Sequence, residues 1–317
     1  MRQIPRFLPH VLVLIFAAWC LYALRGDLAQ VSLAPVLRSW DLVLLAAVFS
    51  LVNYVLRIVR WRSYLARLGY PLGLRFAALT FVAGFAYTLS PGKVGEMVRA
   101  RYYTPLGVPL SKVAAAFFAE RLLDLVSMVV LAALLFAGSP QYRGAILGAA
   151  ALVAVALFIF AVLPWERVGM AIESRDRIPG ILRKALVNVS SAFASTKPLL
   201  RPAPLLFGLA IALAAWGLEG VGLNVLGGML PGPHLDVATS VGVYAVAVLI
   251  GGLSFLPGGL GSTEAVMTTL LVAHGIAVGD AVFLTLACRL VTLWLAVFLG
   301  WVAVLSLRQR TLAVVSP

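Results

Sequence analysis

The sequence predicts an all-α polytopic integral membrane protein with about six full spans and two re-entrant helical hairpins, arranged as an inverted repeat. Three observations lead to this fold class. Hydrophobic residues make up 62% of the chain and charged residues only 12%, whereas soluble domains carry about 25% charged residues. Two Pro-Gly stretches interrupt apolar segments, and charged residues inside such segments recur at matching places in the two halves.

Six apolar segments are long enough to cross a membrane, because a helix needs about 20 apolar residues to span the hydrocarbon core. The predicted full spans are 8–24, 40–66, 109–136, 142–164, 203–229 and 278–306. The first has a basic start and an apolar core, as a signal peptide does. No convincing small-residue cleavage site follows it, and we interpret it as a retained span.

Two further apolar segments, 73–90 and 238–256, each end in a Pro-Gly stretch and are followed by shorter helical segments at 93–106 and 262–276. Proline and glycine interrupt a helix, and irregular backbone at membrane depth survives only when it is buried in protein or faces a water-filled cavity. We therefore predict two re-entrant hairpins. Their turns are formed by Ser90, Pro91, Gly92 and Gly95, and by Pro257, Gly258, Gly259 and Gly261.

Basic loop residues set the orientation of a membrane protein, because cytoplasmic loops are enriched in lysine and arginine. If the N-terminus is cytoplasmic, most of the 25 basic residues fall inside, and the external loops hold only Arg25, Arg38 and Arg143. This bias requires the first hairpin to enter from the cytoplasm and the second from outside. The sequence thus predicts a multi-pass protein of the cell membrane with both termini cytoplasmic.

The two halves form a weak internal repeat of opposite topology. Glu96 and Glu264 are as far apart in sequence as Arg121 and Arg289. Inverted repeats with broken helices are an architecture of transporters, although a duplication kept only for packing is the alternative. We expect one domain over 1–317: a first span and external loop at 1–39, repeat 1 at 40–136, a connecting span and amphipathic cytoplasmic loop at 137–202, repeat 2 at 203–306 and a cytoplasmic tail at 307–317. Within the loop, 165–185 is predicted to be an interfacial helix.

Other classes of function find little support in the sequence. Cys20 and Cys288 lie inside apolar runs and the histidines are scattered, so we expect neither a disulfide framework nor a metal site. No nucleotide-binding glycine loop is present, and we expect no cofactor. The net charge of +13 fits orientation signals and anionic lipid headgroups better than nucleic acid. Membrane lipids are the expected partners, and the oligomeric state stays open.

Three motifs in order carry a resemblance to a known family. They are Thr88-Leu89-Ser90-Pro91-Gly92-Lys93-Val94-Gly95-Glu96, then Glu120-Arg121-Leu122-Leu123-Asp124, then Pro257-Gly258-Gly259-Leu260-Gly261-Ser262-Thr263-Glu264. With these motifs, nearly the whole chain resembles the flippase-like transmembrane region of lysylphosphatidylglycerol synthases, which include the multiple-peptide-resistance proteins. Some stand-alone members accompany genes for hopanoids or other envelope lipids.

The resemblance implies either lipid translocation or a role beside a lipid-modifying enzyme. The leading hypothesis is a transporter that moves an amphipathic lipid with an anionic or phosphate headgroup between leaflets. The alternative is a non-transporting scaffold or accessory subunit for an enzyme of aminoacyl-phospholipid, polyprenyl or hopanoid synthesis. In the full-length synthases a separate soluble domain transfers the amino acid. This chain ends at Pro317, soon after its last span, so we do not expect that activity here.

Charged residues within or beside the apolar segments are the candidate substrate-binding residues. They are Arg121, Arg289, Glu96, Glu264, Glu219, Glu120, Asp124 and Lys93. A mid-span arginine is costly and normally faces the protein interior or a cavity. It could bind a lipid phosphate or form an ion pair with any of the five carboxylates, and the sequence leaves both interpretations open.

The remaining polar residues have weaker assignments. Glu96 and Glu264 could act as gates or proton carriers, or could simply cap the half-helices that follow each turn. Glu219 corresponds to Asn53, which cannot titrate, and this weakens a symmetric proton relay. Arg57, Arg60 and Arg62 are predicted to be orientation signals and headgroup contacts, and Arg99 is counted among the basic residues on the cytoplasmic side. We assign no catalytic residue, because no nucleophile–base pair is evident.

Overall fold

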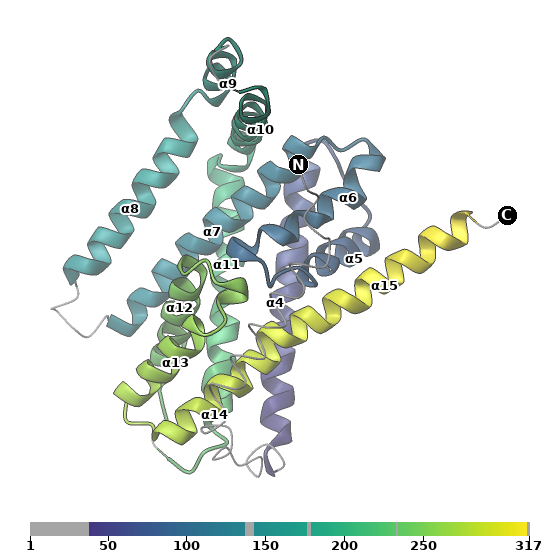
Figure 1. Cartoon of the computed structure of the whole chain (residues 1–317). Coiled ribbons are helices and arrows are strands. Elements are labelled where there is room, and N and C mark those ends of the chain that lie inside the picture. The colour runs from purple at the N-terminus through teal and green to yellow at the C-terminus, as the bar shows by residue number, and fades with distance from the viewer. Residues whose placement is uncertain (1–37, 137–142, 176–178, 233, 316–317) are drawn as a thin grey trace.

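The computed structural model describes residues 38–136, 143–175, 179–232 and 234–315. The predicted first span at 8–24 lies outside the described residues. All the regular elements in the described part are helices. Three of these helical stretches are long and apolar enough to cross a membrane: Trp40–Arg67, Pro202–Gly227 and Val278–Arg308. The helices form one bundle from which α8 and the end of α15 project (Figure 1).

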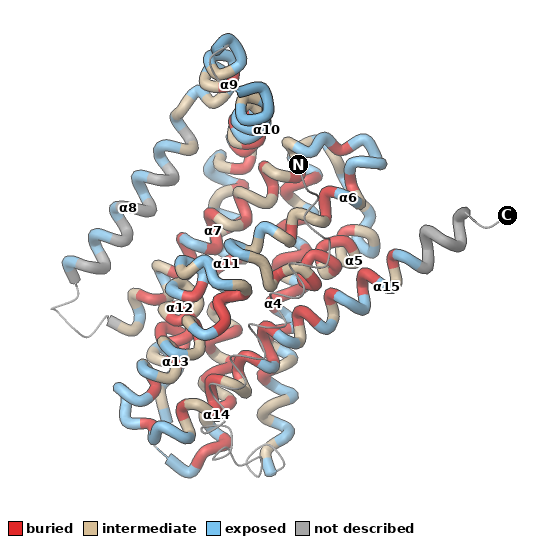
Figure 2. Tube along the Cα trace, viewed as in Figure 1, coloured by how far each residue is buried: buried red, intermediate tan, exposed pale blue. Residues whose placement is uncertain are grey.

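The centre of the bundle is the antiparallel pair α4 (Trp40–Arg67) and α11 (Pro202–Gly227). Gly222 lies beside Ala46 at one end of the contact, and Gly208 lies beside Tyr64 at the other. A polar bond also joins the two helices, because Asn53 Nδ2 donates to the carbonyl of Ala215 at 2.7 Å. Figure 2 shows buried residues concentrated where these helices meet α5, α7 and α12.

The first Pro-Gly stretch interrupts the chain as the sequence predicts. Helix α5 (Leu74–Phe85) ends before it, and the chain resumes as the 3-10 segment η1 (Pro91–Arg99), α6 (Ala100–Tyr103) and η2 (Thr104–Leu106). Gly92 and Lys93 have φ of 59° and 56°, which reverses the chain. The predicted helical segment at 93–106 is therefore mostly 3-10, and α7 (Leu110–Phe136) follows.

The second Pro-Gly stretch has the same plan. Helix α12 (Val237–Leu253) precedes η5 (Pro257–Gly259), and α13 (Ser262–Ala273) follows. Asp236 caps α12 by accepting a hydrogen bond from the Thr239 amide at 2.9 Å. The pKa of Asp236 is lowered, mainly by the hydrogen bond from the Thr239 hydroxyl and then by the one from the Thr239 amide. The segments η1 and η5 contact each other, so the two breaks meet inside the fold.

The last predicted span is one continuous helical stretch with an irregular middle. It comprises α14 (Val278–Arg289), the π-helical turn η6 (Leu290–Trp294) and α15 (Leu295–Val315). Such π turns are rare and often lie at functional sites. Here the turn presents the carbonyl of Thr292, which accepts a bond of 2.6 Å from the Tyr54 hydroxyl on α4.

The connection between the halves differs from the sequence prediction. Helix α8 (Arg143–Val162) occupies the predicted span at 142–164. The predicted single interfacial helix at 165–185 is wrong, because α9 (Trp165–Glu173) and α10 (Gly180–Thr196) are two separate helices packed against each other. Pro179 is the N-cap residue of α10, and Gly169 permits the close approach of Ser190.

Candidate functional site

A cavity of about 280 Å³ lies where the two Pro-Gly segments meet. Both mid-span arginines, Arg121 of α7 and Arg289 of α14, line it. Lys93 and Asp124 line it as well, together with apolar residues of α7 and α12. The two arginines occupy corresponding places in the two halves of the sequence, and in the structure both border this one cavity. Their role in binding remains a prediction.

Arg121 and Asp124 belong both to the lining of this cavity and to a network of charged side chains from α4, η1 and α7. Arg121 lies within 2.9 Å of Glu120, 3.1 Å of Asp124 and 3.8 Å of Glu96. The other members are Arg60 with Asp124 at 2.6 Å, Arg57 with Glu120 at 3.1 Å, and Arg99 with Glu120 at 3.0 Å and Glu96 at 2.5 Å. Arg121 therefore forms ion pairs with carboxylates, and it also lines the cavity, where a ligand could reach it.

The network carries more positive than negative charge. Its cations and the neighbouring lysine are Arg57, Arg60, Lys93, Arg99 and Arg121. Its three carboxylates are Glu96, Glu120 and Asp124. The five cations thus exceed the three carboxylates by two charges. The excess is one positive charge if Glu219 is counted as an ionised fourth carboxylate. An excess of positive charge in a desolvated site favours an anionic ligand.

Lys93 is the cation with the fewest partners in the cavity. No carboxylate among the described residues lies within 4.0 Å of its ammonium, which instead stands 5.4 Å from the centre of the Trp216 ring. Its φ of 56° is rare for a residue with a side chain. Such strain costs about 1–3 kcal/mol and gathers at functional sites. The fold thus holds a lysine in an unfavourable conformation beside the cavity.

Arg289 has a simpler environment than Arg121. Its Nε donates to Glu264 Oε1 at 2.6 Å, and its Nη2 donates to the carbonyl of Gly258 at 2.8 Å. The second oxygen of Glu264 accepts a bond of 2.6 Å from the Gly261 amide, which is a capping interaction. Glu264 therefore caps α13 and fixes Arg289 against the second turn.

The other two predicted glutamates differ in their surroundings. Glu96 accepts a bond from the Thr88 hydroxyl at 2.6 Å and pairs with Arg99, so it belongs to the charged network. Glu219 accepts a bond from Ser50 on α4 at 2.8 Å, and no described cation lies within 4.0 Å of it. The candidate residues are thus brought together, with Glu219 on a neighbouring part of the α4–α11 contact.

Two turn glycines allow close approach of the backbone. A Cβ on Gly95 would come within 2.5 Å of the Tyr87 carbonyl and 2.7 Å of the Ser90 hydroxyl, and the Gly95 amide donates to that hydroxyl at 2.7 Å. A Cβ on Gly258 would come within 2.5 Å of Leu89 in the other hairpin. These glycines therefore let the first turn close and the two turns touch.

The sequence interpretation of three arginines was wrong. Arg57, Arg60 and Arg99 are buried in the network instead of lying in a cytoplasmic loop or at the headgroups. Aromatic rings also lie beside Arg57 and Arg99, and the guanidinium of Arg99 is 4.3 Å from the centre of the Phe81 ring. The signal that could have located them is helical spacing: Asn53, Arg57, Arg60 and Tyr64 follow one face of α4.

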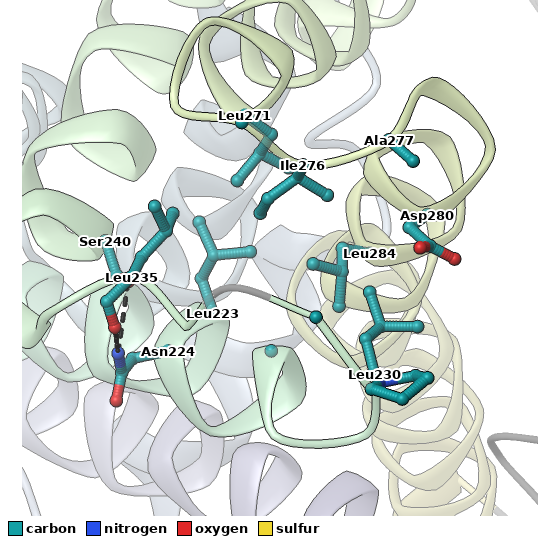
Figure 3. A pocket seen from close by; sticks show the side chains of 14 residues that line it. Leu223, Asn224, Leu230, Leu235, Ser240, Leu271, Ile276, Ala277, Asp280 and Leu284 are labelled. Carbon is teal, nitrogen blue, oxygen red and sulfur yellow. Dashed lines mark hydrogen bonds between the residues drawn. The ribbon is translucent and has the colours of Figure 1, made fainter.

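A second cavity of about 250 Å³ lies at the far end of α11, between α13 and α14. Five leucines and one isoleucine contribute to its wall, and Asn224 donates to the Leu235 carbonyl at 2.7 Å (Figure 3). Asp280 is the acidic residue that lines it. The predicted substrate-binding residues all lie elsewhere, so this cavity is not part of the candidate site.

Comparison with known proteins identifies the family. The model of the lysylphosphatidylglycerol synthase TM region matches residues 10–300. The chain belongs to this family. Its relatives include a UPF0104 membrane protein of Methanothermobacter thermautotrophicus, 26% identical over 84% of both chains. Another is a UPF0104 membrane protein of Pyrococcus horikoshii, 25% identical over 84% of this chain and 87% of the relative.

Membership of the lysylphosphatidylglycerol synthase TM region family, together with the apolar helices, makes this a membrane-embedded, multi-pass protein. The family resemblance drawn from the three motifs is therefore confirmed. Within the part of the chain that the structure describes, no group of three or more histidine, cysteine, aspartate or glutamate residues could hold a metal ion.

Proposed function

We propose that the protein moves an amphipathic lipid with an anionic or phosphate headgroup between the leaflets of the membrane. The observation that carries the proposal is the excess of positive charge around a cavity between two broken helices. Arginine and lysine are the side chains that best recognise phosphate. A buried cationic cavity in a membrane family related to a lipid synthase offers a headgroup a polar path through the hydrocarbon core.

The helix contacts support an inverted repeat, which is the architecture that alternating access uses. Exchanging the halves maps α4 onto α11, α5 onto α12 and η1 onto η5. Helix α5 packs against α15 as α12 packs against α7, and α4 packs against α11. Two-fold related halves produce such reciprocal contacts. In this proposal the chain has six spans and two re-entrant hairpins, and rocking of the halves would expose the cavity to each leaflet in turn.

Lys93→Gln provides the sharpest test of the proposal. Lys93 has no carboxylate partner among the described residues, so its neutralisation should cost at most about 1 kcal/mol of stability, from the contact with Trp216. Translocation of headgroup-labelled phosphatidylglycerol in liposomes should fall about tenfold, because a charge-assisted phosphate contact contributes at least that much. Lys112→Gln, at the start of α7 and outside the cavity lining, is the matched control.

Other outcomes would reject the proposal. If wild-type protein moves no lipid in liposomes, the scaffold alternative is favoured. If Lys93→Gln translocates as wild type does, the cavity is not the path. Arg121→Gln is less informative, because it removes one cation from three carboxylates and should lower stability and translocation together.

A further inference from the structure

We infer that a hydrocarbon chain of the ligand leaves the cavity sideways, through an apolar slot between α7 and α12. We call this the chain slot, and its walls are Leu125 and Met128 of α7 and Val248, Leu249 and Leu253 of α12. The inference rests on the proposed function and specifies how its substrate is held. It makes the site one for an amphiphile whose polar and apolar parts are bound at the same time.

The cavity is divided by chemistry. Lys93, Arg121 and Arg289 line its charged part, whereas the side chains of the chain slot carry no hydrogen-bonding group. A free inorganic anion would use only the first part. A lipid fills both, since burial of apolar area stabilises its chain while the cations bind its phosphate.

The slot opens on an apolar surface. Leu125 is 37% exposed and Leu253 is 60% exposed, and they come from the two walls of the slot. In a bilayer such side chains meet lipid tails, which are as apolar as leucine itself. A chain that passes between them therefore stays in hydrocarbon while its headgroup enters the protein.

The two helices are in close contact at Gly242, whereas there is free space beside Gly252. A Cβ on Gly242 of α12 would fall 2.6 Å from the Cβ of Leu135 on α7, so no chain can pass there. Gly252, ten residues and about 15 Å further along α12, lines the cavity and has nothing within 4 Å of its Cβ position. Gly252 thus leaves space that a larger side chain would occupy.

The first experiment fills the chain slot without disturbing the charges. Gly252→Leu should fold, because its Cβ meets open space, and should slow translocation of phosphatidylglycerol about tenfold, since it displaces about two methylene groups of the chain. Gly148→Leu on α8, also exposed and with open space at its Cβ position, is the control and should leave the rate unchanged. Wild-type rates in Gly252→Leu, beside an active wild type, would overturn the slot and leave the proposed function standing.

The second experiment does not depend on transport. Protein in phosphatidylcholine liposomes is irradiated with phosphatidylglycerol that carries a diazirine in one acyl chain, and labelled peptides are identified by mass spectrometry. Labels on Leu125, Met128 or Leu253 that disappear in Gly252→Leu support the slot. Equal labelling of α8 and the slot in both variants would show ordinary lipid contact and would overturn it. Slot labelling in a protein that moves no lipid would reject the proposed function alone.

Discussion

At the scale of single residues, Arg60 shows how the fold changes the meaning of a charge. The sequence places it among loop arginines, yet its side chain is fully buried and lies 2.6 Å from Asp124. Arg62, two residues later, is exposed and donates to the Leu72 carbonyl at 2.8 Å. Helical geometry turns the two side chains to different faces of α4.

We predict that Arg60→Met destabilises the protein by about 3–5 kcal/mol, because it leaves Asp124 buried with one cation fewer. Arg62→Met, the matched control, should change stability by less than about 1 kcal/mol. Reversible unfolding in detergent micelles, followed by circular dichroism, measures both. Equal stability of the two variants would mean that the network does not hold α4 to α7.

At the scale of elements, the Pro-Gly turns reverse the chain, and the first turn also positions charged residues of the site. Their positive φ values reverse the chain, and Ser90 and Gly95 close the first turn through a bond of 2.7 Å. The closed turn presents Lys93 to the cavity and Glu96 to Arg99. The same residues that end α5 thus position the charges.

We predict that Gly95→Ala opens the first turn and costs about 1–3 kcal/mol, because its Cβ would overlap the Tyr87 carbonyl and the Ser90 hydroxyl. Translocation should fall with it, since Lys93 and Glu96 lose their positions. Gly73→Ala is the control: its φ is −62° and its Cβ position is open. The measurements are thermal unfolding in detergent and the liposome assay, and unchanged values for Gly95→Ala would contradict the importance of the turn.

At the scale of the whole molecule, topology is the property that tests the proposed inverted repeat. Leu235, next to His234, and Asp280 both line the second cavity, so these two positions lie at one end of the bundle (Figure 3). Lys184 lies on α10 and is exposed.

We predict that cysteines at His234 and Asp280, in a background without Cys20 and Cys288, react with an impermeant maleimide added from outside. A cysteine at Lys184 should react only after the membrane is opened, because the topology predicted from the basic loops has α10 in the cytoplasm. Labelling of His234 and Asp280 from opposite faces would remove the inverted repeat and with it most of the transport argument.

The sequence by itself determined the helices and the places where they break. The expected segments 40–66, 109–136 and 203–229 correspond to α4, α7 and α11 within about two residues, because apolar length and Pro-Gly chemistry are local properties. Among the described helices, the clear failure at 165–185 is also local in origin, since mixed polarity hides the break that separates α9 from α10.

Only the tertiary structure decided which charges meet. Arg57, Arg60 and Arg99 join Glu96, Glu120 and Asp124 from three separate elements. Periodicity shows that α4 has a polar face, but it does not say which helix covers that face. The pairing matters for stability because these charges are buried. Water would screen such a charge in an exposed loop, whereas a charge inside the fold is strongly destabilising unless it is paired. The proposed chain slot has the same origin, since its walls come from α7 and α12, which only the fold brings together.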